Sequence, residues 1–491
     1  MDKNETKIED KELEEIISKR LTSLKQKIVV IGTGITSSHL GDERNIREFI
    51  IADSLVKKIR EKDVNVLFYL FDDSYDPLNF RQLRVAVNKD EELIKKFEKY
   101  CGVPIRLIPD PYECHINYSS HFQNEILDRF HNLGIYPNII DSYSSYESGL
   151  FNDAKEIVFK KRKEINVYLK KTFPKYTMKK LFYPICIKCL KMEGVDIKRI
   201  VKDRVTVLCS NCGHKFSDSV RNIRGKFSWK IDVAVKWNVF KVDFEPFSKA
   251  YLDPDVGSYF IAKKISEFFF DGYYPESINY GQIVMDKSLS YKALMSLPKD
   301  AFVSFFIKNR KKDMELSEKK FIQFAHDYKI DKNLSFYDYI MSLLPYDLFD
   351  RLQGKKSVNH KNVDYGIAFA AHFLGRELYP KLPTRELIME VPNNILIKIK
   401  EIFLWVVSNK IEYPDHEINV FTQEFTNYLK ENYVDKKLIF PTIRKLVSQE
   451  HTLPMSKIFF YAPLTYLSGC LLMILQTRAN AGKKVQMTIL K

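Results

Sequence analysis

Over residues 27–150, apolar runs typical of strands alternate with apolar residues at helical spacing, and this alternation constrains the fold of the chain most strongly. Three apolar runs typical of strands, "KIVVIG", "VNVLFYLF" and "VPIRLIPDP", alternate there with stretches whose apolar residues recur at helical spacing. Parallel strands need long crossover connections, which are usually helical. The pattern therefore predicts an α/β fold with a parallel sheet and crossover helices.

The first strand leads into a loop that is suited to anion binding. The stretch "IGTGITSSHLGDERNIREF", from Ile31 to Phe49, bends through Gly32 and Gly34 before a helix opens at "NIREF". Unpaired backbone N–H groups and the helix dipole converge at such a junction and attract phosphates. The stretch is a candidate nucleotide site.

The pattern changes twice farther along the chain. Between residues 155 and 225 a lysine-rich helical segment precedes a cysteine module, which is typical of an insertion. The sheet is expected to resume with "KIDVAVKW" and "VDFEPFS", and the chain from residue 296 onward has a mostly helical pattern. An uncharged run at residues 458–475 is interrupted by Pro463 and Gly469, and we interpret it as helical core, not as a membrane span.

Charge and length limit the classes of function. The 491 residues include 78 Lys and Arg against 63 Asp and Glu, and the net charge of +15 favours a polyanionic partner such as RNA. This length predicts roughly three domains. The N-terminal stretch "MDKNETKIEDKELEEI" is charged and lacks an apolar signal core, so we expect a cytoplasmic protein without membrane association.

Four of the seven cysteines form a metal-binding pattern. Cys186 and Cys189 in "CIKC" precede Cys209 and Cys212 in "CSNC", with nineteen residues between the pairs. Two such knuckles can place four thiolates around Zn²⁺ as a tetrahedron. A closed site of four thiolates has no open coordination position, so we predict a structural zinc ion that holds the insertion together.

Several longer stretches occur in a fixed order: "GTGIT", "LFDDSYDPL", "PDPYECHINYSSHF", the CxxC pairs and "GKFSWKIDVAVKWNVFKVDFEPFSKAY". Together they resemble class I lysyl-tRNA synthetases of the archaeal type over residues 27–310. The resemblance implies a Rossmann-like nucleotide-binding domain, a zinc-ribbon insertion and an all-helical C-terminal domain. The expected ranges are an N-terminal helix at 1–26, the catalytic domain at 27–155 and 226–295, the insertion at 156–225, and a helical anticodon-binding domain at 296–491.

The activity that the resemblance implies is that of a lysine–tRNA ligase. Such an enzyme uses ATP and Mg²⁺ to activate lysine as lysyl-adenylate and then transfers the lysyl group to tRNA(Lys). Catalysis of the first step rests mainly on positioning and on stabilisation of the phosphate charges. We expect a monomer that binds RNA through its lysine-rich insertion and its helical domain.

The family's first signature, of the His-x-Gly-Asn type, is altered here, and two alignments remain open. Aligned without a gap, Asp42 replaces the signature His, Arg44 replaces its Gly, and Asn45 is kept. Alternatively "HLGD" is the signature in a displaced position, which gives His39, Gly41 and Asp42. In the first alignment Arg44 could bind a phosphate of the nucleotide. A surface loop with an Asp N-cap is the alternative without a catalytic role.

The family's second signature, a mobile lysine-serine loop, is altered as well. "MDKSLSYKAL" stands in its place, where Ser288 and Ser290 match. Lys287 or Lys292 is a candidate for the cation that neutralises the leaving pyrophosphate, because a flexible ammonium tolerates a shift of one residue. The alternative is a basic surface turn.

The resemblance also implies a lysine pocket. It assigns Gly34, Thr36, Trp229 and Tyr280 to that pocket, and Tyr251 stands where the family has a pocket His.

Two further pocket candidates follow from chemistry. A buried lysine ammonium needs an anionic or aromatic partner. Asp72 and Asp73 in "FDDS" follow a predicted strand, where ligands bind in such sheets, so both are candidates for binding it.

Two histidines are candidates for positioning the nucleotide or the acceptor end of the tRNA. His115 and His121 in "ECHINYSSHF" lie between a predicted strand and a predicted helix, and they resemble the family's pattern. A purely structural role is the alternative.

Two classes of function are compatible with these residues. The first is a lysine–tRNA ligase with displaced nucleotide-binding residues. The second is a catalytically inactive synthetase-like protein that binds tRNA or another RNA.

Overall fold

The computed structural model describes residues 3–24, 28–40, 46–285, 293, 295–308, 310–331, 334–345, 347, 360–374, 382–410, 418–446, 454–462 and 464–489. The chain divides into two compact units. Unit 1 consists of Met1–Val284 and Val303–Glu315, and unit 2 consists of Met285–Phe302 and Leu316–Lys491.

Unit 1 is built on a five-stranded sheet with the order β10-β9-β1-β2-β3. The strands are β1 Ile28–Ile35, β2 Asn65–Asp72, β3 Asn138–Asp141, β9 Phe244–Ser248 and β10 Glu276–Tyr280. Every neighbouring pair is parallel. The predicted parallel sheet is therefore confirmed, and its carboxyl ends lie on one edge.

Two segments predicted as strands have other structures. "KIDVAVKW" lies in the helix α9, Trp229–Phe240. Because α9 is buried on several sides, at Ile231, Ala234, Val235 and Trp237 among others, it lacks the apolar stripe that marks a surface helix. "VPIRLIPDP" forms an isolated bridge at Pro104 and the 3₁₀ turn Ile105–Leu107 but no strand, since its prolines cannot donate to a strand ladder.

The remaining elements of unit 1 are helices around the sheet and a small all-β insertion. The helices are α1 Lys3–Ser23, α2 Ile46–Arg60, α3 Phe80–Ala86, α4 Glu91–Phe97, α5 Tyr118–Asn132, α6 Ser142–Glu147, α7 Asn152–Lys160, α8 Arg162–Thr172 and α10 Ser258–Phe269. The insertion contributes β4 Phe182–Pro184, β5 Val195–Val201, β6 Arg204–Cys209, β7 Lys215–Ser219 and β8 Gly225–Phe227.

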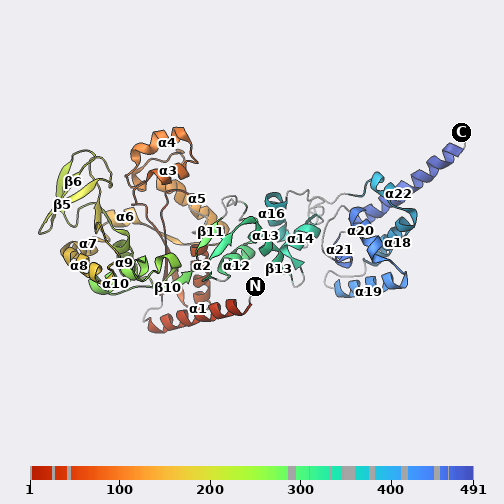
Figure 1. Ribbon diagram of the computed structural model, residues 1–491, viewed down its shortest axis with the longest axis horizontal. Helices are drawn as coiled ribbons and strands as arrows, with labels where there is room; N and C mark the ends of the chain where they lie inside the picture. Colours follow the sequence, from red (N-terminus) through yellow and green to blue (C-terminus); the bar gives the residue numbers. More distant parts are fainter. Residues whose placement is uncertain are drawn as a thin grey trace. The chain divides into compact units, whose positions relative to one another are not determined.

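One core connects the sheet with the insertion. The same cluster of buried side chains contains Phe71 of β2, Trp237 of α9, Ile265 of α10, Phe227 of β8 and Val207 of β6. Figure 1 shows α9 and α10 next to α7 and α8. The insertion therefore packs as part of unit 1.

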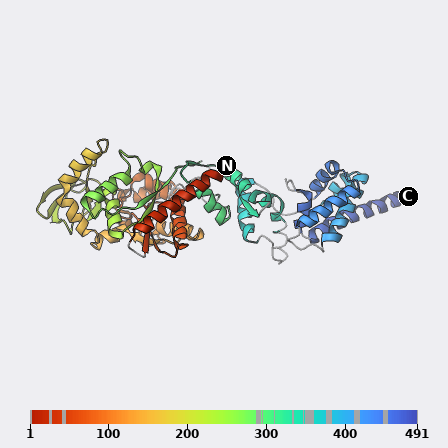
Figure 2. The same cartoon turned by 90° about the horizontal axis from the view of Figure 1, so that it is seen from below.

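The N-terminal helix α1 lies on the outside of unit 1, as the view in Figure 2 shows. Its Arg20 contacts a carboxylate oxygen of Asp243 at 3.4 Å and the carbonyl of Tyr274 at 3.3 Å. The other oxygen of Asp243 accepts a hydrogen bond from the amide of Val30 in β1 at 2.8 Å. One carboxylate thus joins α1 to the central strand.

Unit 2 is mostly helical, as the sequence predicts. Its helices are α13 Glu318–Asp327, α14 Phe336–Ser342, α16 His360–Phe369, α17 Arg385–Glu390, α18 Asn393–Lys410, α19 Ile418–Glu431, α20 Lys436–Leu446, α21 Met455–Tyr461 and α22 Leu464–Ile489. Short strands β13 Lys329–Asp331 and β14 Leu334–Ser335 form a hairpin, and α12 Lys299–Ile307 crosses the boundary between the units, as do the paired strands β11 Ile283–Met285 and β12 Met314–Leu316.

The uncharged run at residues 458–475 forms parts of α21 and α22, and its Phe459, Leu467 and Cys470 are buried. In the part of the chain that the structure describes, we find no helix with the length and apolar character that a bilayer span requires.

Arg47 joins α2 to the segments that follow β10. Its side chain is fully buried, and Nε donates to the carbonyl of Phe306 at 3.0 Å. Nη1 donates to the carbonyls of Gly281 at 2.9 Å and Lys312 at 3.0 Å. A Cβ at Gly281 would lie 2.1 Å from the oxygen of Lys312, so only glycine permits this approach.

We expect Arg47→Met to lower the free energy of unfolding by about 3 kcal/mol, because buried carbonyl groups lose a charged donor. Urea unfolding followed by circular dichroism measures this change. Arg60→Met is the control, since Arg60 is exposed at the end of the same helix. Equal stability of the two variants would contradict the structural role of Arg47.

Candidate functional site

A cavity of about 320 Å³ lies at the carboxyl ends of β1, β2 and β9. Five of the seven residues expected in the lysine pocket line it: Gly34, Thr36, Asp73, Trp229 and Tyr251. Asp72 and Tyr280 do not line this cavity. The structure thus brings together most of the predicted pocket residues from separate parts of the chain.

Two aromatic side chains form one wall of the cavity. Trp229 begins α9, and Tyr251 ends a 3₁₀ turn after β9. Their rings meet edge to face, with centroids 5.4 Å apart and an interplanar angle of 78°. Both side chains remain partly exposed, so the wall can cover an alkyl chain or a cation.

Glu48 is a pocket residue that the sequence did not reveal. It lies in the first turn of α2, where Oε1 accepts from the amide of Gly34 at 3.4 Å and Oε2 accepts from the hydroxyl of Tyr280 at 2.8 Å. Burial outweighs these hydrogen bonds and raises the pKa of Glu48 to about 7. Tyr280 therefore acts on the cavity through Glu48.

Glu245 of β9 is a second carboxyl group that the sequence did not reveal. Its Oε2 accepts from the indole N–H of Trp237 at 2.5 Å. Burial and, to a smaller extent, the nearby Glu48 raise the pKa of Glu245 to about 8. Within the described residues, neither Glu48 nor Glu245 forms an ion pair with a basic side chain. Both carboxyl groups are suited to binding a cationic ligand.

Asp73 differs from these two because it is already paired. Lys236 of α9 lies 2.6 Å and Lys226 of β8 lies 3.6 Å from the same oxygen of Asp73. Lys226 also binds Asp76 at 2.5 Å, and Lys236 binds Asp232 at 2.8 Å. Although burial opposes ionisation, the two ammonium groups hold the pKa of Asp73 below its usual value. These five residues form a buried charge network beside the cavity.

Asp72 supports the loop after β1 and does not face the ligand cavity. It accepts hydrogen bonds from the amide of Ser37 at 3.1 Å and from the side-chain amide of Gln123 at 2.7 Å. Burial raises the pKa of Asp72 to about 7. His39 lies in the same loop and is half-buried.

Most of the two signature stretches lies outside the described residues. This applies to Gly41, Asp42, Arg44 and Asn45 of the first stretch and to Lys287, Ser288, Ser290 and Lys292 of the second. Their roles stay predictions from the sequence.

The structure groups His115 and His121 with Asp110 and Cys114. Cys114 Sγ lies 3.1 Å from Nδ1 of His115 and 3.2 Å from Nδ1 of His121, and it lies 3.3 Å from Asp110 Oδ2. One ligand atom from each of the four residues lies within 4.8 Å of the others. Two imidazoles, a thiol and a carboxylate are ligands that Zn²⁺ accepts. The pattern D-x3-C-H-x5-H was the sequence signal for this cluster.

Neighbouring groups orient this second cluster. Backbone amides of Tyr112, Cys114 and His115 donate to the Asp110 carboxylate. His121 stacks on Tyr112, and its Nε2 faces Glu125 at 3.4 Å. A carboxylate on the far nitrogen of a histidine is typical of metal sites, because it fixes the ring and its tautomer. A role of His115 and His121 in nucleotide positioning stays untested.

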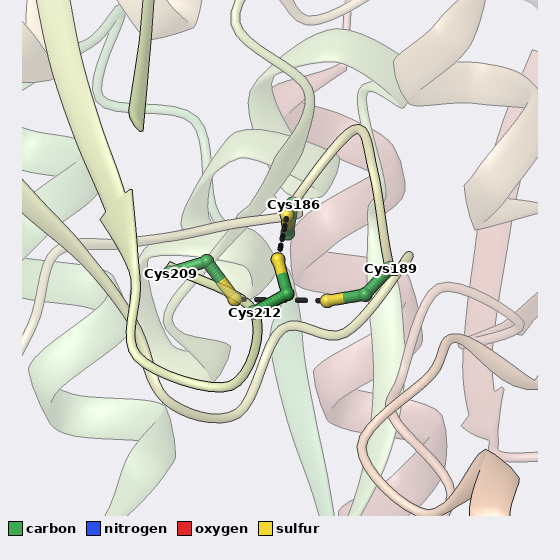
Figure 3. Close-up of side chains that lie close together, drawn as sticks. All are labelled: Cys186, Cys189, Cys209 and Cys212. Atoms are coloured by element: carbon green, nitrogen blue, oxygen red, sulfur yellow. Dashed lines mark hydrogen bonds between the residues drawn. The ribbon is translucent and has the colours of Figure 1, made fainter. Parts of the chain in front are cut away.

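The four cysteines of the insertion converge as the spacing predicts (Figure 3). The sulfur atoms of Cys186 and Cys212 lie 3.6 Å apart, as do those of Cys189 and Cys209. Zn–S bonds of about 2.3 Å in a tetrahedron place the sulfurs about 3.8 Å apart. The geometry therefore fits a tetrahedral Zn²⁺ ion and does not fit disulfides.

Comparisons with known proteins agree with this geometry. Residues 7–362 match the family described as "tRNA synthetases class I (K)". The lysine–tRNA ligase of Methanococcus maripaludis is 32% identical over 270 residues, which are 53% of this chain and 48% of that protein. That of Archaeoglobus fulgidus is 29% identical over 256 residues, which are 51% of this chain and 49% of that protein. The chain spans about half the length of the curated relatives it matches.

We expect the purified protein to contain about two zinc ions per chain by mass spectrometry of metals, because two clusters offer four ligands each. Cys189→Ser and Cys114→Ser should each reduce this content to about one ion. Cys101→Ser is the control and should retain both ions, since Cys101 belongs to neither cluster. A content that Cys114→Ser leaves unchanged would argue against the second cluster.

Proposed function

Because the chain belongs to the class I tRNA synthetase family of the lysine type, we propose that it is a lysine–tRNA ligase. It activates lysine with ATP and transfers the lysyl group to tRNA(Lys). The observation that carries this proposal is a cavity with an aromatic wall and two carboxyl groups that lack a basic partner among the described residues.

The side chain of lysine matches the chemistry of this cavity. Its ε-ammonium binds Glu48, which Tyr280 and the amide of Gly34 hold in place. Its alkyl chain packs against Trp229 and Tyr251. Ion pairing compensates the cost of removing the ammonium from water. A neutral side chain of the same length would leave Glu48 without a partner, so the site favours lysine.

The proposed reaction takes place where β1 ends and α2 begins. The lysine carboxylate attacks the α-phosphorus of ATP, pyrophosphate leaves, and a ribose hydroxyl at the tRNA 3′ end then attacks the lysyl carbonyl and releases AMP. Mg²⁺ supplies charge neutralisation on the phosphates. Residues 39–45 and 287–292 are the proposed phosphate-binding segments, with Arg44 and Lys287 or Lys292 as the cations.

The other parts of the chain have supporting roles in this proposal. The four cysteines hold a structural zinc ion in the insertion, and the cluster of Asp110, Cys114, His115 and His121 holds a second ion. Residues 296–491 bind the anticodon region. The enzyme is cytoplasmic and monomeric.

A second candidate function is a catalytically inactive protein that binds tRNA or another RNA. This candidate is favoured because both signature stretches depart from the family pattern. The departures are Asp42 and Arg44 in the first stretch and Asp286 and Tyr291 in the second. Lysine-dependent exchange of pyrophosphate into ATP, measured with tRNA present, separates the two candidates. Exchange supports the ligase, whereas RNA binding without exchange or charging supports the inactive protein.

We expect Glu48→Gln to raise the KM for lysine in this exchange by about 10- to 100-fold, because a charge-assisted contact of about 1.5–3 kcal/mol is lost. The pH profile is a second readout. A carboxyl with a pKa of about 7 is increasingly ionised between pH 6 and 8, so lysine binding by the parent protein tightens over that range.

In Glu48→Gln the step near pH 7 should disappear. A weaker step from Glu245 should remain and should move to lower pH than in the parent, because the charge of Glu48 no longer raises the pKa of Glu245. Glu61→Gln is the control, since Glu61 is exposed directly after the end of α2, and it should behave like the parent. A KM that does not change would place the lysine ammonium elsewhere.

A further inference from the structure

A second cavity, of about 360 Å³, lies in the zinc-binding insertion and shares no residue with the candidate lysine cavity. It is enclosed by α7 and α8 on one side and by β4 and β5 on the other. Nothing in the proposed reaction uses it.

The floor of this cavity is apolar and well packed. Phe159 of α7 and Phe182 of β4 are nearly buried, and their rings meet with centroids 5.3 Å apart. Val158 and Leu181 extend this surface. The two rings meet edge to face at 63°, and the floor suits an apolar or aromatic group.

An irregularity in β5 gives the cavity its second wall. Side chains alternate along a strand, so residues 197 and 200 would ordinarily point to opposite faces. The register of β5 against β6 shifts between Ile197 and Arg199. As a result both Ile197 and Ile200 line the cavity, which is the kind of side-chain redirection that β-bulges produce.

The rim of the cavity is basic. Arg162 and Lys163 at the start of α8 line it, and within the described residues no carboxylate pairs with either of them. Lys180 on the opposite rim is held by Asp196 at 2.6 Å and by the carbonyl of Val195 at 3.1 Å. The rim therefore offers two cations to an anionic group while its third cation is neutralised.

We propose that this cavity binds one unpaired nucleotide of an RNA, with the base on the Phe159–Phe182 floor and a phosphate at Arg162 and Lys163. An apolar floor beside two cations that no described carboxylate neutralises matches the base and the phosphate of one nucleotide. Unstacked bases are the part of RNA that proteins read by stacking. Exposed Lys160 and Lys179 extend the positive surface for neighbouring phosphates.

This inference rests on the proposed function only in that tRNA would supply the nucleotide. The first test compares two double variants with the same change in charge. Arg162→Glu with Lys163→Glu alters the rim, whereas Lys170→Glu with Lys171→Glu alters the other end of α8, which does not line the cavity. Thermal unfolding confirms that both variants are folded.

We expect the rim variant to weaken binding of unmodified tRNA(Lys) at least tenfold more than the control variant. Asn166→Trp, which fills the mouth of the cavity without a change in charge, should also weaken it. Equal losses in the two double variants would mean that only overall charge matters, and that result would overturn the proposal.

The second test does not depend on the ligase activity. Isoleucine methyl NMR of the full chain is followed during titration with CMP, AMP or ribose 5-phosphate. We expect the two nucleotides to shift Ile197 and Ile200, and ribose 5-phosphate, which lacks a base, to leave them unchanged. If the nucleotides have no such effect, the proposal fails, whatever the exchange assay shows. If they do and the protein binds no tRNA, the proposed function fails instead.

Discussion

The buried charge network beside the sheet edge is the interaction on which the rest of unit 1 depends. Lys226 comes from the last strand of the insertion, Lys236 from α9, and Asp73 from the end of β2. Asp232, whose partner is the hydroxyl of Tyr146, closes the network on the side of α6. Removal of one member of such a buried set leaves an uncompensated charge at a cost of about 3–5 kcal/mol. The network therefore fixes how the insertion, α9 and the sheet meet.

The same network explains why the acidic groups of the candidate cavity differ in their ionisation. Asp73 is ionised and neutralised by lysines, so it contributes shape and polarity but little net charge. Among the described residues Glu48 and Glu245 have no such partner, and burial keeps part of their population protonated near neutral pH. A cavity without a ligand thereby avoids two buried negative charges, and a cationic ligand supplies the compensation that lets them ionise.

Much of this architecture can be predicted from the sequence, because it depends on patterns of residues that are close together in the chain. The apolar runs predict β1 and β2, and the CxxC spacing predicts that four sulfur atoms lie together, as they do in the fold. The helix α9 was missed because burial on several sides removes the amphipathic period, and its β-branched residues then resemble a strand. β3 was missed because four residues, "NIID", are too few to show a pattern.

The candidate site was predicted less completely than the fold. Glu48 follows a helix start and looks like an ordinary first-turn acid, and only the tertiary contacts with Gly34 and Tyr280 bring it to the cavity. The sequence does not show that Asp73 is paired with lysines, because these partners are more than 150 positions away in the chain. The grouping of His115 and His121 around one thiol could have been predicted from the local spacing of Asp110, Cys114, His115 and His121.

The core that runs from the sheet into the insertion limits how this protein can evolve. Insertions that are exchanged between genes as cassettes meet their host along a boundary with few contacts. Here the boundary passes through one cluster of buried side chains, to which both Phe227 and Trp237 belong. Recombination at residues 156 and 225 would therefore cut through a hydrophobic core. The insertion can change by substitution in place, but it is not a portable module.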